Sequence, residues 1–265
     1  MFRKNLKFNY ILYLLIFILL FPTFSLASES IYVWSNNSEK LKDSSQVSSG
    51  NLKKDISNNS LNLQSGSAVL IEQNSGKLLY SHNIHEKLRP ASVTKIMTIL
   101  LIMEAIDSGK LSYNDRIPCT ENAAGMGGSQ IWLDVREELS VDEMLKAICV
   151  VSANDCTVAI AEYLEGSQEA FVKKMNEKAK ELGMNDTCFK NCHGIDEDGH
   201  LSSAYDIALM SRELLTKHPN ITKYTTIWMD TLRNGKSQLV NTNKLIRNYK
   251  GITRLKNWIY FFSFI

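Results

Sequence analysis

The sequence predicts an α+β fold in which a block of helices is inserted between parts of an antiparallel sheet. Two observations carry this prediction. A β-hairpin signal is present at residues 68–80 and another at residues 228–240. Between the two hairpins, residues 92–218 contain apolar or amphipathic segments with helix start and stop signals.

Each hairpin has two short runs that favour strands, separated by turn residues. In the first, Ala68–Ile71 and Lys77–Tyr80 flank the polar turn Gln73–Gly76. In the second, Trp228–Val240 turns at Asn234-Gly235, a pair that favours tight hairpin turns. We therefore expect antiparallel strands on both sides of the helical block.

The helical block begins with a segment that is apolar on every side. Ile96–Met103 follows Pro90 with few polar residues, which predicts a buried helix, and Gly109 ends it. A second helix opens at the capping box Ser140–Glu143 and runs to Val151. The remaining predicted helices cover residues 155–164, residues 168–182 closed by Gly183, and a segment from Ser203–Asp206 to about His218-Pro219.

The 265-residue chain divides into an export signal, a spacer and one folded domain. Met1–Ala27 has a basic start, an apolar core and a small-residue cleavage site, as in a secretory signal peptide. An uncleaved membrane anchor is the alternative. Residues 28–64 are rich in Ser, Asn and Lys, which predicts a disordered spacer. Residues 65–265 then form the domain, outside the cytoplasm.

Charge gives no argument for a nucleic-acid partner. The chain has 30 Lys and Arg against 28 Asp and Glu. Removal of residues 1–27 would take away three basic residues and leave a net charge of about −1. Five cysteines are an odd number for an exported protein, and Cys149 and Cys156 lie in apolar surroundings typical of buried thiols.

Ser92 and Lys95 form the first candidate catalytic pair. Positions i and i+3 share one face of a helix, so Lys95 Nζ could reach Ser92 Oγ at the start of the buried helix. Burial would favour the neutral, proton-accepting amine. The alternative is a serine that only caps the helix, beside a lysine placed there by chance.

Ser152 and Asn154 form a second polar pair, between two apolar helical segments. A hydroxyl and an amide in a buried loop need hydrogen-bond partners, because each unpaired group costs about 1–3 kcal/mol. They could be functional. Equally, both could simply cap the helix that begins at Asp155.

The two pairs together resemble the motifs of penicillin-binding proteins and serine β-lactamases, and most closely those of the D-alanyl-D-alanine carboxypeptidases. Pro90–Thr98 is similar to that family's nucleophile segment, and Glu181–Asn185 and His193–Asp206 are similar to the segments that follow. The resemblance extends from Ser65 to about Leu255. It implies the transpeptidase-like α+β fold of that family and the release of the terminal D-alanine from peptidoglycan stem peptides, in cell-wall synthesis and remodelling.

The resemblance also implies a role for each residue of the motifs. Ser92 would attack the peptide carbonyl and form an acyl-enzyme, and Lys95 would take its proton. Ser152 would pass that proton to the leaving group, and Asn154 would hold the peptide amide. The Ser92 N–H would be one oxyanion donor. β-Lactams would be covalent inhibitors, and neither a metal nor a cofactor is expected.

The third motif of that family, Lys-Thr-Gly, is incomplete. Lys256 stands at its first position, but Asn257-Trp258 follow it and Arg254 replaces a usual glycine. Codons can be chosen for residues 256–265 so that deleting one adenine restores Lys-Thr-Gly-Tyr-Thr-Ser-Ser-Ala-Leu. We therefore expect a one-base frameshift that leaves the domain truncated, inactive and poorly folded; a genuine shorter variant is the alternative. Whether the intact form attaches to a membrane stays open.

Three other functions compete with this interpretation. A β-lactamase needs a carboxylate to activate water, and Glu181 is a candidate, although it lies on a charged helix. A metal-binding module is the second; it would use Cys188, Cys192, His193 and His200, but their spacing matches no standard zinc pattern. A disulfide between the two cysteines, or two free thiols, would also explain that cluster. A truncated wall-binding relic without catalysis is the third.

Overall fold

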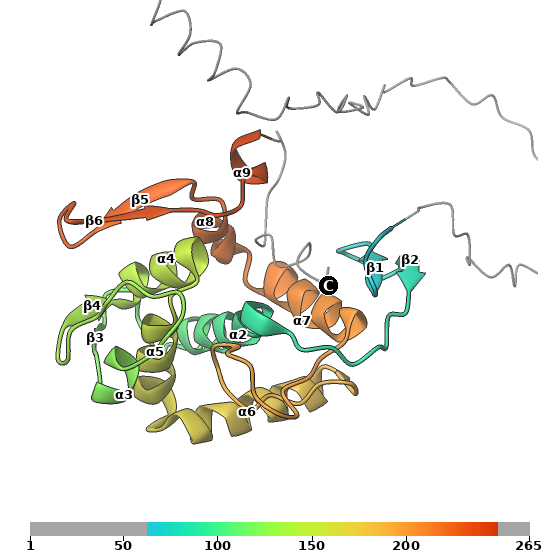
Figure 1. Cartoon of the computed structure of the whole chain (residues 1–265), viewed down its shortest axis with the longest axis horizontal. Coiled ribbons are helices and arrows are strands. Elements are labelled where there is room, and N and C mark those ends of the chain that lie inside the picture. Colours follow the sequence, from blue (N-terminus) through green and yellow to red (C-terminus); the bar gives the residue numbers. More distant parts are fainter. Residues whose placement is uncertain (1–62, 249–265) are drawn as a thin grey trace, which may run out of the picture. The chain divides into compact units, whose positions relative to one another are not determined.

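The computed structural model describes residues 63–248, and these confirm the α+β class. Within them, all strands belong to two-stranded antiparallel sheets. The two expected hairpins are β1–β2 and β5–β6, and the sequence did not predict the third pair, β3–β4 (Figure 1). The strands are β1 (Ala68–Ile71), β2 (Leu78–His82), β3 (Arg116–Pro118), β4 (Glu138–Ser140), β5 (Met229–Leu232) and β6 (Ser237–Val240).

The predicted helices are present with bounds close to those expected. A 3₁₀ turn, η1 (Ala91–Thr94), leads into the buried helix α2 (Lys95–Asp107). Four other long helices complete the block: α4 (Val141–Val151), α5 (Asn154–Glu165), α6 (Gln168–Glu181) and α7 (Ala204–Lys217). Short helical turns join these elements: α3 (Glu121–Ala124), η2 (Pro219–Ile221), α8 (Thr222–Thr225) and α9 (Leu245–Asn248).

Local signals explain several helix ends. The Ser140 hydroxyl accepts from the Glu143 N–H and the Glu143 carboxylate accepts from the Ser140 N–H, as the capping box predicts. Ser203 caps α7 in the same way, by accepting from the Asp206 N–H. Gly183, at a φ of +74°, follows the last turn of α6.

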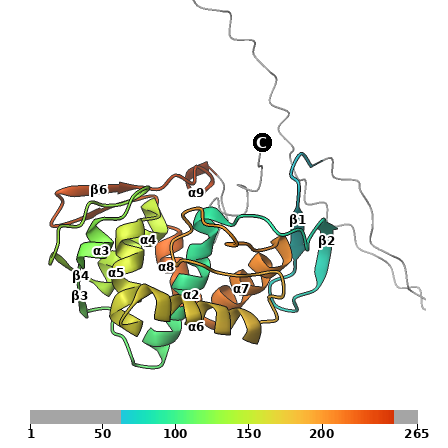
Figure 2. The same cartoon turned by 60° about the horizontal axis from the view of Figure 1, so that its bottom comes forward.

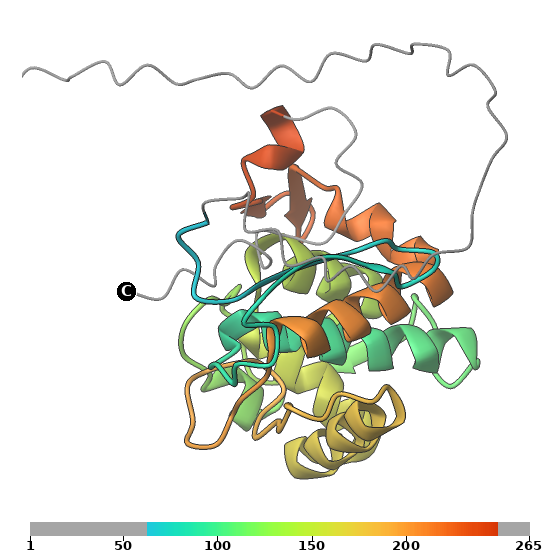
Figure 3. The same cartoon turned by 90° about the vertical axis from the view of Figure 1, so that its right-hand side faces the viewer.

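Helix α2 is the centre of the core. Residues 95–103 are all buried, and α2 packs against α5, α6 and α7, which surround it in Figures 1 and 2. Figure 3 shows the β1–β2 hairpin running across α7, which β1 contacts. The helix that carries Lys95 is therefore fixed by neighbours on several sides.

Three predictions about other parts of the chain have different outcomes. Cys149 and Cys156 are buried thiols, as expected, and no disulfide joins Cys188 to Cys192. The signal peptide, the spacer and the altered third motif with Lys256 lie outside the described residues and stay predictions. Among residues 63–248, no helix is both long and apolar enough to cross a membrane.

Candidate active site

Ser92 and Lys95 meet at the start of the buried helix. Ser92 lies in η1 and Lys95 is the first residue of α2, so a single turn separates them. Lys95 is completely buried, and its Nζ lies 3.4 Å from Ser92 Oγ and 2.6 Å from the carbonyl oxygen of His193. Ser92 caps neither element, so the capping alternative is wrong for this residue.

The backbone just before Ser92 is strained. Ala91 has a φ of +46°, a backbone conformation that residues other than glycine rarely adopt. The loop at Gly194 packs directly on this peptide: a Cβ added to Gly194 would lie 1.9 Å from Ala91 O and 2.9 Å from Ser92 N. The loop therefore determines the position of the Ser92 backbone.

The segment from residue 188 to residue 202 binds η1 and the first turns of α2 at three further points. His193 O accepts from Lys95 Nζ at 2.6 Å, and Cys192 O accepts from Thr98 Oγ1 at 2.6 Å. The third contact joins His200 Nε2 to Thr94 Oγ1 at 2.7 Å. His200 Nδ1 accepts from the Lys190 N–H, so the neutral ring carries its proton on Nε2 and donates to Thr94.

Both histidines in this segment are buried and neutral at pH 7. Burial, with smaller contributions from the Lys95 side chain and from His200, lowers the pKa of His193 to about 4. Burial also lowers the pKa of His200. Their neutral rings accept hydrogen bonds from backbone N–H groups, His193 from Ile195 and His200 from Lys190. In this structure they hold the loop in place.

The Ser152–Asn154 pair lies in the tight turn between α4 and α5. Ser152 ends α4 at a φ of +62°, and α5 begins at Asn154 with no side-chain cap. The alternative in which both residues cap a helix beginning at Asp155 is therefore wrong, and Ser152 is instead the C-cap residue of α4. Helix α5 packs against α2, which places the second pair on a neighbour of the helix that carries the first.

Two polar atoms of this turn are buried without a hydrogen-bond partner in the described part of the chain. They are Ser152 Oγ and Asn154 Oδ1. Asn154 Nδ2 donates to Gly127 O at 2.8 Å, and its backbone N–H donates to Ser129 O at 2.7 Å. The amide is thus fixed through its nitrogen while its oxygen is left to accept.

The loop that Asn154 contacts is a further part of the site, which sequence reasoning missed. Asp155 is fully buried, and its Oδ2 accepts from the N–H groups of Ile131 and Leu133 at 3.0 and 3.1 Å. Arg233, in the β5–β6 turn, binds the same loop through its guanidinium. The one sequence feature that could have indicated this loop contact is Asp155, the aspartate directly after the Ser152–Asn154 pair.

Two competing assignments are not supported. Glu181 is exposed and forms an ion pair with Lys178 at 2.8 Å, so it lies on the solvated helix face expected for it. Within residues 63–248, no group of three or more His, Cys, Asp or Glu side chains could hold a metal ion.

The arrangement places a serine hydroxyl beside a buried lysine, and comparison with known proteins identifies the family of the chain. The peptidase S11 family, described as D-alanyl-D-alanine carboxypeptidase, matches residues 53–257. The chain belongs to the S11 peptidase family. This confirms the resemblance drawn from the two motif pairs.

Individual S11 relatives match over part of their length. The Bacillus subtilis (strain 168) D-alanyl-D-alanine carboxypeptidase DacF is 56% identical over 193 residues, 72% of this chain and 49% of that protein. The Escherichia coli (strain K12) enzyme DacC is 38% identical over 157 residues, 57% of this chain and 39% of that protein. The chain thus spans about half the length, or less, of these curated relatives.

Solved S11-like structures confirm the fold. Penicillin-binding protein 6B from Escherichia coli matches with a TM-score of 0.69 at 31% identity, over 74% of this chain and 63% of that one. Penicillin-Binding Protein D2 from Listeria monocytogenes, in its ampicillin-bound form, matches with a TM-score of 0.66 at 30% identity, over 74% and 79%.

Proposed function

We propose that this chain carries the acylation site of a serine-type D-alanyl-D-alanine carboxypeptidase that acts on peptidoglycan stem peptides. The observation that carries the proposal is the buried Lys95 amine, 3.4 Å from Ser92 Oγ at the start of the core helix. Membership of the S11 family supports it. β-Lactams would acylate the same serine; the similar Listeria protein has been solved in an ampicillin-bound form.

Each residue has a defined task in this mechanism. Ser92 Oγ bonds to the carbonyl carbon before the terminal D-alanine, while Lys95 Nζ takes the hydroxyl proton. Ser152 passes a proton to the departing amine as the carbon–nitrogen bond breaks. Water then cleaves the ester and regenerates the serine. The unpaired Oδ1 of Asn154 would accept from the substrate's peptide N–H.

Substitution of the two central residues tests the assignment. In a frame-restored, full-length protein, Ser92→Ala should abolish covalent labelling by a fluorescent penicillin and release of D-alanine. Lys95→Arg should do nearly the same, because a guanidinium does not act as a base at neutral pH. Ser81→Ala and Lys110→Arg change the same residue types elsewhere and should retain activity. Labelling of the Ser92→Ala variant at the same rate as the protein that retains Ser92 would refute the mechanism.

We propose in addition that the protein is exported and acts at the cell wall or on the outer face of the cytoplasmic membrane. The order of basic, apolar and small residues in Met1–Ala27 supports this, as does the wall-directed activity named for the family. N-terminal sequencing of the mature protein should begin at Ser28. Intact Met1 in the membrane fraction would favour an anchor instead.

A further inference from the structure

Trp132 is exposed in a conformation that is unfavourable in two ways. Its φ is +60°, which costs a bulky side chain roughly 1–2 kcal/mol. Its side chain is 76% exposed, so the indole gains little from burial. Strain of this kind persists where the surrounding structure enforces it, and it gathers at binding sites.

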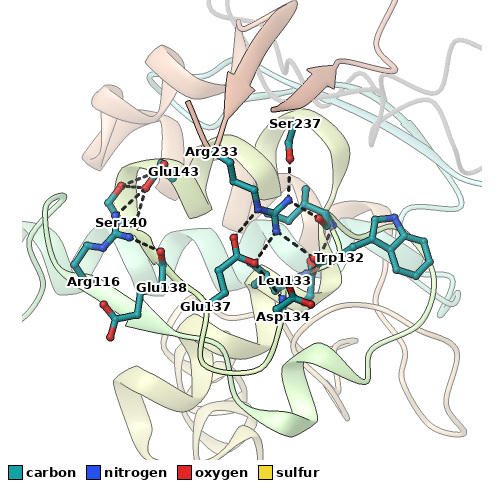
Figure 4. A network of polar contacts seen from close by, with 12 residues as sticks. Arg116, Trp132, Leu133, Asp134, Glu137, Glu138, Ser140, Glu143, Arg233 and Ser237 are labelled. Carbon is teal, nitrogen blue, oxygen red and sulfur yellow. Dashed lines mark hydrogen bonds and ion pairs between the residues drawn. The ribbon is translucent and has the colours of Figure 1, made fainter. Parts of the chain in front are cut away.

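The surrounding structure does enforce it, through hydrogen bonds to the backbone on both sides of Trp132 (Figure 4). Asp155 Oδ2 accepts from the N–H groups of Ile131 and Leu133. From the opposite side, Arg233 donates to Ile131 O at 2.9 Å and to Trp132 O at 3.1 Å. Ile131 and Leu133 are buried, so the residue between them is turned outward.

Arg233 is itself held firmly. Both oxygens of Glu137 accept from it, at 2.5 and 2.8 Å, and a further bond goes to Ser237 Oγ at 2.8 Å. Its hydrogen bonds hold the pKa of Glu137 below the usual value. The β5–β6 turn and α5 are therefore both hydrogen-bonded to the loop at residues 131–133. Figure 4 shows the Trp132 indole pointing away from Arg233 and Glu137.

The loop borders the candidate active site. Asn154 binds it at Gly127 O and Ser129 O, directly before Asp155 binds it at residues 131 and 133. Trp132 follows Ser129 by three residues, so their Cα atoms are at most about 11 Å apart. That is also roughly the length of three extended peptide residues.

We propose that Trp132 is a binding contact for the stem-peptide residues that precede the scissile D-alanyl bond. The inference rests on the proposed function, since it takes Asn154 as the group that holds the peptide amide. A flat indole provides apolar contact at a small entropic cost because it has only two rotatable bonds, and tryptophan often dominates binding energy. The proposed ligand is thus the extended peptide, and its aliphatic groups would lie on the indole.

Equilibrium binding tests the contact independently of turnover. In a Ser92→Ala variant of the frame-restored, full-length protein, isothermal titration calorimetry measures the Kd of a synthetic pentapeptide ending in D-Ala-D-Ala and that of N-acetyl-D-Ala-D-Ala, which lacks the three residues before D-Ala-D-Ala. Trp132→Ala should raise the Kd of the pentapeptide roughly 5- to 30-fold and leave the Kd of the dipeptide unchanged. Trp132→Phe should retain part of the affinity.

Tyr163→Ala removes an aromatic side chain that is 49% exposed on α5, and serves as the matched control. An unchanged pentapeptide Kd in Trp132→Ala overturns the inference, as does absence of pentapeptide binding by the Ser92→Ala chain. An equal loss for both ligands also overturns it, because the indole would then support the loop rather than touch the peptide. Failure of the proposed function is a separate result: no penicillin labelling and no D-alanine release by the frame-restored, full-length protein.

Discussion

Gly194 offers the sharpest test of how the site is assembled. It has a φ of +90°, and a Cβ placed on it would lie 1.9 Å from Ala91 O and 2.9 Å from Ser92 N. Both neighbours are backbone atoms, which cannot rotate away. Gly194→Ala must therefore move either the loop or the peptide that carries Ser92, by about 1.5 Å to reach ordinary van der Waals contact.

The expected effect has a conformational part and a packing part. A left-handed conformation costs an alanine about 1–2 kcal/mol, and overpacking a dense region costs about 1–3 kcal/mol more. We expect Gly194→Ala to lower the free energy of unfolding by about 2–5 kcal/mol. Acylation should slow by about 100-fold, because a misplacement of 1 Å in an active site has an effect of that size.

Gly109→Ala is the matched control. Gly109 has a φ of +73° with no atom within 4 Å of an added Cβ, so only the conformational part applies. Urea unfolding and the rate of acylation by a fluorescent penicillin are measured for both variants, with near-UV circular dichroism to establish that each is folded. If Gly194→Ala loses no more stability than Gly109→Ala, or acylates at the original rate, the contact does not set the position of Ser92.

Two further predictions concern the groups that hold the loops of the site. The pKa of His193 is about 4 in the folded chain and about 6.5 in an unfolded one. The neutral ring therefore contributes fully to the free energy of unfolding above pH 6.5. This contribution is about 3 kcal/mol and is lost as the pH falls toward 4. The free energy of unfolding in urea should therefore differ less between pH 7 and pH 4.5 for His193→Gln than for the chain with His193. Arg233→Gln should lower the free energy of unfolding by about 1–3 kcal/mol and speed hydrogen exchange at Ile131. The control Arg116→Gln removes a more exposed ion pair with Glu143 and should cost less than about 1 kcal/mol. Equal effects of the two arginine changes would contradict the role given to Arg233.

Features set by neighbouring residues were predictable from the sequence. The capping box at Ser140, the glycine stop at Gly183 and the turn at Asn234-Gly235 all depend on residues a few positions apart, and the structure has each of them. The burial of Lys95 followed from the apolar run behind it. Such signals depend on local backbone preference and on periodicity, both of which can be read along the chain.

Features that depend on distant segments were not predictable. The β3–β4 pair has three residues in each strand, too few for a periodic pattern to be recognised. The partner of Lys95 is the backbone carbonyl of His193, and a carbonyl is present at every residue. The contact of Arg233 with residues 131 and 132 spans about a hundred positions and leaves no mark in either segment.

The Ser152–Asn154 turn shows how a cost in stability identifies a site. From the sequence, capping and function explained both residues equally well. The structure excludes side-chain capping of α5 and leaves Ser152 Oγ and Asn154 Oδ1 buried with no partner in residues 63–248. Each such atom costs about 1–3 kcal/mol, a large fraction of a typical net stability of about 5–15 kcal/mol. A fold that retained these groups for packing alone would be more stable with apolar side chains in their place, so their presence beside the helix that carries Lys95 favours a role in binding substrate.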